Sequence, residues 1–417
     1  MAARIFPKAL LCITLALAAS CSSSTEPDPA APSAPLEALP RALSVGEQRV
    51  VGAANDFSFA LFRRLSAAQK DSNVFASPLS ASMALGMAMT GAAGGTYDEM
   101  RTTLGFGTAA SESEIGESYK SLIALLRGLD PGVDFKIANS IWYRTGFPVD
   151  PAFLDRSRNW FDARASALDF ASASAVPTIN DWVSTSTAGK IPTILDKIEA
   201  DQVMFLINAI YFKGSWRTRF DPALTVTAPF HAVGGDQSAK LMRRDGTMRW
   251  LQTADFEAVD LPYGNGAYSM TVVLPAAGKR VDDVAASLQP SAWSAWVGQF
   301  HDADVELELP RFRLEWERML IPDLQSLGMR AAFEDNGADF SRMTTQGTQL
   351  YISLVKQKTY VDVNEEGTEA AAVTNVGISL TSAPVRRPFI VDRPFLFVLR
   401  ERLSGTILFM GKITRLP

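Results

Sequence analysis

The stretch NEEGTEAAAVTNVGISLTSAPVRRP, residues 364–388, is the part of this 417-residue chain that says most about its fold. From Thr368 to Thr381 the even positions are small and then increasingly apolar, while the odd positions are mostly polar or small. A period of two is typical of a half-buried β-strand. Yet the alternation follows Gly367 and runs into 382–388, whose two prolines and two arginines indicate an exposed loop. The stretch carries the signals of both a buried strand and a loop.

The composition sets wide bounds on fold and partners. Hydrophobic residues make up 47% of the chain, enough for a large core, and the net charge is -5. A negative chain gives no electrostatic reason to bind nucleic acid. After residue 20 no stretch approaches the roughly 20 apolar residues that a membrane span needs.

The N-terminus has the features of an export signal. Arg4 and Lys8 precede the apolar run ALLCITLALAAS, residues 9–20, which ends directly before Cys21. This arrangement resembles the signal of bacterial lipoproteins, which implies that Cys21 is lipidated after removal of residues 1–20. A plain secretory signal cut nearby remains the alternative. Either way we expect an exported protein, lipid-anchored to the cell envelope (the outer membrane in a two-membrane bacterium) or extracellular.

Composition also divides the rest of the chain. Residues 21–43 are rich in serine, proline and alanine and indicate a stiffened tether. Residues 44–417 contain no comparable linker and no repeat, which predicts one domain of mixed helix and strand. The only cysteines are Cys12 and Cys21, so we expect no disulfide in the mature protein.

Local patterns predict several elements of this domain. We expect a helix over 78–100, capped by Ser77 with Pro78 in its first turn, and an amphipathic helix over 115–129. The near-continuous apolar run 202–212 favours a strand covered on both faces. Further strands are expected in the segments 267–275, 305–316, 393–401 and 405–414.

Signatures of common enzymes and cofactor sites are absent from the sequence. The two histidines, His231 and His301, are far apart, and no G-x-S-x-G motif occurs. The glycines of GAAGG (91–95) and GFG (105–107) lack the Lys-Ser/Thr of a phosphate loop and favour helix ends. We therefore expect no metal, no cofactor and no enzymatic activity.

The segment EEGTEAAAVT, residues 365–374, resembles the hinge of the reactive-centre loop of serpins, the large serine-protease inhibitors. Other segments resemble the same family in the same order, and together they cover about residues 44–417. These segments are NVFASPLSASMAL (73–85), INDWVSTSTAGKI (179–191, after the family's sixth helix), LINAIYFKGSWRTRFDPALT (206–225), LPRFRLEW (309–316), LGMRAAFEDNGADFSRM (327–343) and RPFLFVLRERLSGTILFMGKI (393–413).

The resemblance implies an α+β serpin fold with three β-sheets, about nine helices and an exposed reactive-centre loop. It also implies a metastable protein whose loop is cut by a serine protease and then inserts into the main sheet while the protease is still attached. That mechanism accounts for the double pattern, because residues 368–381 would be a loop first and a central strand later. A permanent strand is the alternative, although the small residues of TEAAA are poor β-formers.

The resemblance also assigns the functional residues of the loop. It places the reactive bond between Thr381 and Ser382, and the small Thr381 would suit elastase-like or subtilisin-like proteases. A cut after Leu380 is the alternative, which would suit a chymotrypsin-like or subtilisin-like enzyme. Arg386 and Arg387 are interpreted as a solvated surface pair. The hinge residues implied are Glu365, Glu366, Gly367, Thr368, Glu369, Ala370, Ala371 and Ala372.

Two further regions of the family pattern lie beneath the opening sheet. Trp216 matches the breach, and Ser77, Ser80 and Asn208 match the shutter cluster. Gln357 stands where the family usually has a histidine, so the shutter would lack a titratable ring. Segment 107–120 is acidic where some relatives carry a basic helix, so we expect no heparin-like activator.

Two functions remain open at this point. The first is a monomeric suicide inhibitor that forms a covalent complex with an extracytoplasmic serine protease. The second is a non-inhibitory serpin that acts as a carrier or chaperone. Relatives of the second kind usually carry bulky, charged or proline residues that break the hinge pattern. The hinge of this chain instead matches the pattern of the inhibitory relatives, which favours the inhibitor.

Overall fold

The structure is a computed structural model that describes residue 1, residues 34–369 and residues 386–417. Within these ranges the chain forms nine α-helices, in agreement with the expected number. They are α1 (Val45–Ala68), α2 (Pro78–Met89), α3 (Gly94–Thr103), α4 (Glu112–Arg127), α5 (Pro151–Phe161), α6 (Ala175–Ser186), α7 (Val281–Ser287), α8 (Pro290–Gln299) and α9 (Ile321–Ser326). Three short 3₁₀ turns occur at η1 (Pro222–Leu224), η2 (Ala331–Phe333) and η3 (Gly347–Gln349).

The strands of the described residues pair into two sheets. In spatial order, the six-stranded sheet contains β10 (Phe312–Met319), β11 (Lys356–Asn364), β12 (Gly367–Thr368), β4 (Met204–Ser215), β2 (Val133–Arg144) and β3 (Ala163–Leu168). All its pairs are antiparallel except β2 with β3. The two-residue strand β12 is therefore the only link between β11 and β4 among these strands.

The second sheet has nine strands. In spatial order these are β1 (Val74–Ala76), β15 (Ile407–Ile413), β14 (Phe395–Glu401), β8 (Tyr268–Pro275), β7 (Phe256–Pro262), β6 (Gly235–Gln252), β9 (His301–Pro310) and β13 (Arg387–Ile390), with β5 (Val226–Ala232) paired to β6. The family pattern implies three sheets, and the 18-residue strand β6 accounts for the difference. It pairs with β5, β9 and β7 in turn along its length, which joins two expected sheets into one.

Helix α2 occupies the core between the sheets, because it contacts β4 of one and β15 of the other. All of its residues except Ala84 are buried, as its continuous apolar sequence favours. As predicted, the Ser77 side chain caps it and Pro78 lies in its first turn. The predicted helix over 78–100 is wrong in extent, however. Glycine is a poor helix former, and the GAAGG stretch separates α2 from α3, which begins at Gly94 with φ +51°.

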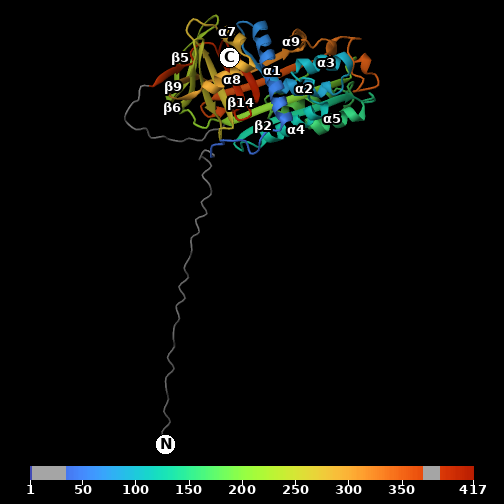
Figure 1. Ribbon diagram of the computed structural model, residues 1–417, viewed down its shortest axis with the longest axis horizontal. Coiled ribbons are helices and arrows are strands. Elements are labelled where there is room, and N and C mark those ends of the chain that lie inside the picture. The colour runs from blue at the N-terminus through green and yellow to red at the C-terminus, as the bar shows by residue number, and fades with distance from the viewer. Residues whose placement is uncertain (2–33, 370–385) are drawn as a thin grey trace. The chain divides into compact units, whose positions relative to one another are not determined.

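The remaining predicted elements fare better. The amphipathic segment 115–129 lies largely in α4, and the apolar run 202–212 lies largely in β4. The segment 305–316 divides at Arg311 into β9 and β10, which belong to different sheets. In Figure 1, helices α3 and α5 lie at the opposite end of the domain from strands β5, β6 and β9.

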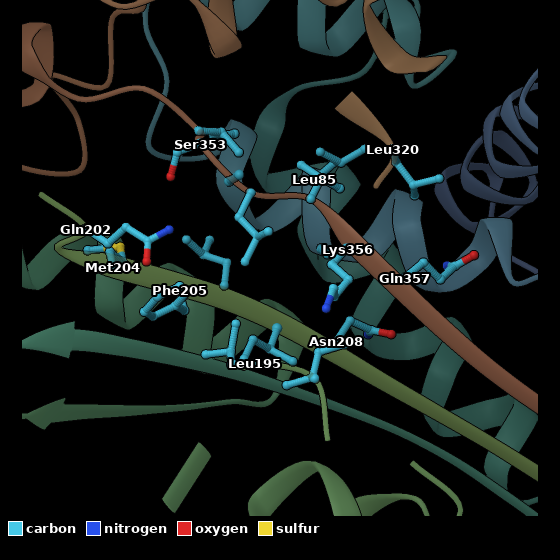
Figure 2. A pocket seen from close by; sticks show the side chains of 18 of the residues that line it. Leu85, Leu195, Gln202, Met204, Phe205, Asn208, Leu320, Ser353, Lys356 and Gln357 are labelled. Atoms are coloured by element: carbon cyan, nitrogen blue, oxygen red, sulfur yellow. The ribbon is translucent and has the colours of Figure 1, made fainter. Parts of the chain in front are cut away.

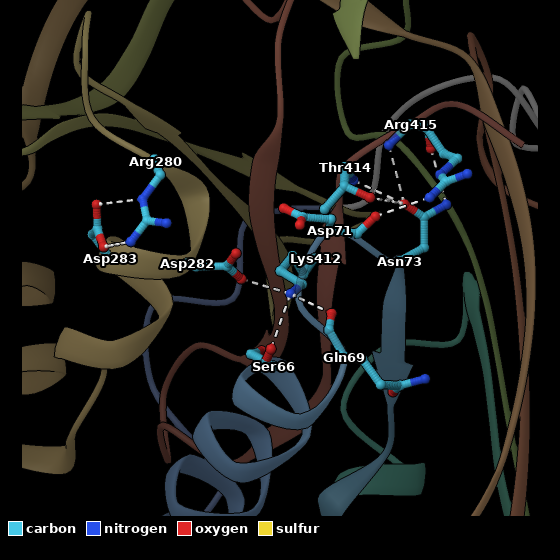
Figure 3. A network of polar contacts seen from close by, with 10 residues as sticks. All are labelled: Ser66, Gln69, Asp71, Asn73, Arg280, Asp282, Asp283, Lys412, Thr414 and Arg415. Carbon is cyan, nitrogen blue, oxygen red and sulfur yellow. Dashed lines mark hydrogen bonds and ion pairs between the residues drawn. The ribbon is translucent and has the colours of Figure 1, made fainter. Parts of the chain in front are cut away.

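A buried lysine fastens the last strand to the helices. Lys412 of β15 is fully buried, and its ammonium group donates to the backbone oxygens of Ser66 (3.2 Å) and Gln69 (2.9 Å) (Figure 3). Asp282 of α7 supplies a carboxylate at 2.6 Å. Three acceptors satisfy the three N–H donors of the ammonium group, which offsets the cost of removing the charge from water.

Residues 34–43 dock against the domain, although they belong to the stretch predicted as a tether. Leu36, Leu39 and Leu43 are half-buried against the core. The Leu36 N–H donates to the Asn265 oxygen (2.8 Å), and Arg402 donates to the Leu36 oxygen (2.9 Å). The polypeptide therefore contacts the domain before α1 begins.

The start of α1 is held by a buried carboxylate whose charge should matter for acid stability. Glu47 is buried and accepts two hydrogen bonds from Arg41 at 2.7 and 2.6 Å, which lower its pKa from 4.5 to about 2. A carboxylate with a depressed pKa in the folded state stabilises that state above its unfolded pKa, and the contribution is lost as the pH falls toward the folded pKa.

We expect Glu47→Gln to lower the free energy of unfolding at pH 6 by about 2–3 kcal/mol. The difference from the unmodified protein should shrink as the pH falls from about 4.5 toward 2. Urea denaturation followed by tryptophan fluorescence measures both values, with Glu37→Gln, at an exposed position of the same segment, as the control. A difference that is constant with pH would contradict the role of the charge.

Among the described residues, no helix is both long enough and apolar enough to cross a membrane.

Candidate functional site

The first hinge residues already form a strand. Gly367 and Thr368 make up β12, where Thr368 pairs with Val363 of β11 and with Gly214 of β4. Glu369 follows, and its carboxylate lies 2.7 Å from the ammonium group of Lys190. The predicted hinge residues Ala370, Ala371 and Ala372 and the predicted reactive-bond residues Leu380, Thr381 and Ser382 lie outside the described residues, as does Cys21.

Gly367 is required by the close approach of β12 to β4. Its φ of +155° is a conformation that L-amino acids with a side chain rarely adopt. A Cβ at this position would collide with the backbone oxygen of Gly214 and lie 2.7 Å from the Cα of Ser215. Only glycine allows the hinge to enter the sheet at this depth.

Thr368 points into the breach, where it meets the first of two stacked aromatic side chains. Its side chain is buried, and its hydroxyl lies 2.7 Å from the Tyr263 hydroxyl. Complete burial raises the pKa of Tyr263, so its hydroxyl remains protonated. Tyr263 stacks on Trp216 with centroids 4.4 Å apart, and the Trp216 indole donates to the Asn364 oxygen (2.9 Å). Trp216 thus holds the chain just before the hinge, in the predicted breach.

A buried carboxylate paired with a solvent-exposed guanidinium fixes the other side of the breach. Glu365 is buried and accepts a hydrogen bond from the Arg311 guanidinium (2.6 Å) and another from the Thr225 hydroxyl. Its backbone oxygen accepts from the Phe220 N–H (2.9 Å). Glu366 accepts at its backbone oxygen from the Trp216 N–H (2.8 Å). These contacts fix the segment from which the loop departs.

Sequence reasoning missed Tyr263, Arg311 and Lys190 as parts of this site. Tyr263 is 105 residues from Thr368, and Arg311 is 54 residues from Glu365. No local pattern joins such distant positions. The resemblance covered the segment that contains Arg311, but it named no partner for that residue.

The shutter residues form two groups beneath the sheet. The Gln357 amide donates to the Ser77 oxygen (2.8 Å) and accepts from the Ser77 N–H (3.1 Å), so it satisfies both backbone groups of that residue. The Ser80 hydroxyl donates to Asn208 Oδ1, and the Asn208 amide donates to Asn139 Oδ1 (2.6 Å). Gln357 thereby binds β11 to the start of α2, and Asn208 binds β4 to the same helix.

Gln357 carries no ionisable group, which leads to a pH prediction. We expect the rates of loop insertion and of polymerisation to change less than about twofold between pH 5 and 7. The variant Gln357→His should introduce a dependence in that range, because an imidazole titrates there. Native gel electrophoresis after incubation at each pH measures both rates, and a sharp change in the unmodified protein would contradict the prediction.

Below β12 a cavity of about 390 Å³ separates β4 from β11 (Figure 2). Gln357 and Asn208 face it from the two strands, and α2 lies beneath it. Apolar side chains form most of its wall, including Leu85, Ile191, Ile194, Leu195, Met204, Phe205, Leu320, Leu350, Ile352 and Leu354. Apart from β12, no described strand pairs with the facing edges of β4 and β11. Below β12, the facing edges of β4 and β11 are therefore without a strand partner among the described residues.

Within the described residues, no group of three or more histidine, cysteine or acidic side chains could hold a metal ion. The chemistry available at the site is hydrogen bonding by strand edges and burial of apolar side chains.

Comparison with known proteins gives one consistent result. The family model described as "Serpin (serine protease inhibitor)" matches residues 52–416. Human leukocyte elastase inhibitor is 32% identical over 374 residues, which cover 86% of this chain and 97% of that protein. The thermophilic serpin tengpin, in its native state, gives a TM-score of 0.81 at 29% identity and covers 92% of this chain and 97% of its own.

A carrier protein of the same fold is about equally similar. Human thyroxine-binding globulin gives a TM-score of 0.81 at 27% identity, covering 89% of this chain and 99% of its own. Nearly the whole length of each relative is thus matched, by the domain that contains the hinge, breach and shutter described above. This chain belongs to the serpin family and has the mixed α+β serpin fold.

Proposed function

We propose that this protein is a suicide-substrate inhibitor of extracytoplasmic serine proteases. The observation that carries the proposal is the open sheet, in which β12 lies at the head of a gap between β4 and β11. Family membership supports serine protease inhibition as the general activity, since relatives such as leukocyte elastase inhibitor are named for it.

The inhibitory step begins as an ordinary acyl transfer. The serine oxygen of the protease attacks the carbonyl carbon of Thr381, and the bond between Thr381 and Ser382 breaks. The amine of Ser382 leaves with a proton, and the protease remains attached to Thr381 as an ester. Residues 368–381 then extend β12 down the gap as a strand of about 46 Å, at about 3.3 Å per residue. The attached protease is carried with them, and its catalytic site is distorted before water can hydrolyse the ester.

The residues of the loop suit this movement. Gly367 and Thr368 already lie in register with both neighbouring strands, so insertion continues an existing ladder. Proline cannot donate to a ladder, and none occurs between 368 and 381. The native state would thus be kinetically stable without being the state of lowest free energy.

The target is proposed from the residues beside the cut. Thr381 is small and β-branched, which suits elastase-like pockets or the broad pockets of subtilisin-like enzymes. A cut after Leu380 would suit chymotrypsin-like or subtilisin-like enzymes. The similarity to leukocyte elastase inhibitor is consistent with the first class.

The site of action is proposed from the N-terminal sequence. Export, lipidation of Cys21 and a tether formed by the residues between Cys21 and the docked segment 34–43 would place the inhibitor at the bacterial cell envelope. Helix α4 begins with Glu112 and Glu114, so no cationic surface for a heparin-like activator is expected there. We propose that the protein acts as a monomer.

The decisive experiment mixes the protein with pancreatic elastase and, separately, with subtilisin. An inhibitor gives a covalent complex that survives boiling in detergent, and mass spectrometry of the released C-terminal peptide identifies the cut bond. Thr381→Arg is the matched variant, because it should transfer complex formation toward trypsin. Cleavage of the loop without any complex would refute the proposal.

A carrier or chaperone is the second candidate, supported by the similarity to thyroxine-binding globulin. That function needs no loop insertion. A protein that is cut or ignored by both proteases, with unchanged thermal stability after the cut, would favour it.

A further inference from the structure

Glu369 is the residue at which the chain turns out of the sheet. Its N–H still donates to the Asp362 oxygen (3.0 Å) and extends the ladder of β12 by one bond. Its φ is +57°, in the left-handed region that residues other than glycine seldom occupy. A strained residue at the end of a two-residue strand needs contacts that keep it in place.

The carboxylate of Glu369 has such contacts. Its side chain is only 5% exposed and lies 2.7 Å from the ammonium group of Lys190, which is itself 36% exposed. The same ammonium group lies 4.9 Å from the centre of the Tyr360 ring of β11. The carboxylate also acts on β4, because burial together with the nearby Glu369 charge raises the pKa of the Tyr211 hydroxyl. Groups from both flanking strands therefore surround the pair.

Lys190 lies in a hydrogen-bonded turn. The turn follows α6, with Ala188 and Gly189 at φ +51° and +79°. The Gly189 N–H donates to the Ser184 oxygen (2.7 Å), and the Lys190 N–H donates to the Thr187 oxygen (3.0 Å). The next residue, Ile191, lines the cavity that the loop would fill. The segment that covers the gap thus also carries the cation that holds the hinge.

We propose that Lys190 is a positioning residue that keeps Gly367, Thr368 and Glu369 seated between β4 and β11. Withdrawal of the hinge removes the Glu369 carboxylate from Lys190, whereas extension of β12 leaves the side chain on the same face of the sheet. The ion pair therefore favours the seated hinge over the withdrawn one. When the hinge is seated, the first residues of the inserting strand are already paired with β4 and β11. Insertion then avoids the entropic cost of capturing a free chain end.

The inference predicts a change in how the acyl-enzyme divides between a trapped complex and hydrolysis. The protease is trapped only if insertion is faster than hydrolysis of the ester. Loss of the seated hinge slows insertion but leaves the scissile bond itself unaltered. Lys190→Met should therefore raise the number of inhibitor molecules consumed per trapped protease, while the rate constant of loop cleavage stays the same. This kinetic part rests on the proposed inhibitory function, whereas the seating of the hinge does not.

The primary measurement is hydrogen exchange, which needs no protease. We expect amides of the peptide covering 365–369 to exchange about fivefold faster in Lys190→Met, the upper range for a partly exposed ion pair. Lys190→Arg should behave like the unmodified protein. Lys197→Met is the matched control, because Lys197 pairs with Glu199 at 2.5 Å on the same segment. The exchange of Lys190→Glu should be slowed again when Glu369→Lys is added.

Each outcome decides the inference. Unchanged exchange in Lys190→Met overturns the seating role, and so does a charge-swapped pair that exchanges as fast as Lys190→Glu alone. If the hinge amides of Lys190→Met exchange faster but the ratio of trapped to cleaved inhibitor is unaltered, the seated hinge does not speed loop insertion. If the unmodified protein traps no protease at all, the proposed function fails, and the exchange rates still decide whether Lys190 seats the hinge.

Discussion

Cleavage of the reactive loop is expected to raise the unfolding temperature of this protein by about 10 °C or more. Insertion would bury Val376, Ile378 and Leu380, which is worth about 5–9 kcal/mol at 1.5–3 kcal/mol per side chain. The entropy of unfolding is about 2.1 cal/mol/K per residue, so this burial alone raises the unfolding temperature by about 6–12 °C in a domain of this size. New ladder hydrogen bonds offset the backbone entropy that the loop loses.

A metalloprotease such as thermolysin is the suitable reagent, because it forms no acyl-enzyme and so nicks the loop without being trapped. Differential scanning calorimetry then compares intact and nicked protein, with a sample exposed to chelator-inactivated thermolysin as the control. Equal unfolding temperatures, with residues 370–385 still open to further proteolysis, would show that the sheet does not accept the loop.

The substitution Gly367→Ala is expected to convert the inhibitor into a substrate. Its Cβ would meet the backbone of Gly214 and Ser215, which cannot move aside as a flexible side chain could. The positive φ adds strain that alanine does not tolerate. The hinge should be displaced from β4, and we expect the yield of covalent complex to fall at least about tenfold, since each 1.4 kcal/mol changes a partition tenfold. Detergent gels after reaction with elastase measure the yield.

A second glycine supplies the control for this substitution. Gly235 has a φ of +131°, and a Cβ there would meet no atom within 4 Å. Gly235→Ala therefore imposes comparable backbone strain without a collision and should keep its complex yield. If Gly367→Ala also keeps its yield, and its nicked form still gains thermal stability, then close approach at the breach is not needed for insertion.

The hinge was predicted through the resemblance of EEGTEAAAVT to serpins, which a short local segment is enough to carry. The capping of α2 by Ser77 was predictable because a cap depends on adjacent residues. The extent of that helix was predicted wrongly, because the helical spacing of the apolar residues was followed through GAAGG, whereas α2 ends before these glycines. The sequence also did not predict that Thr368 is already seated in the sheet. That position depends on the Tyr263 hydroxyl and on Gly214, which approach it only after distant strands have paired.

The place of β15 in the nine-stranded sheet has a consequence for biosynthesis. This strand ends four residues before the end of the chain as given, lies between β1 and β14, and brings Lys412 opposite Val74. Contacts of such long sequence separation form late, because closing the intervening loop costs entropy first. A nascent chain cannot complete this sheet until its final strand has been synthesised.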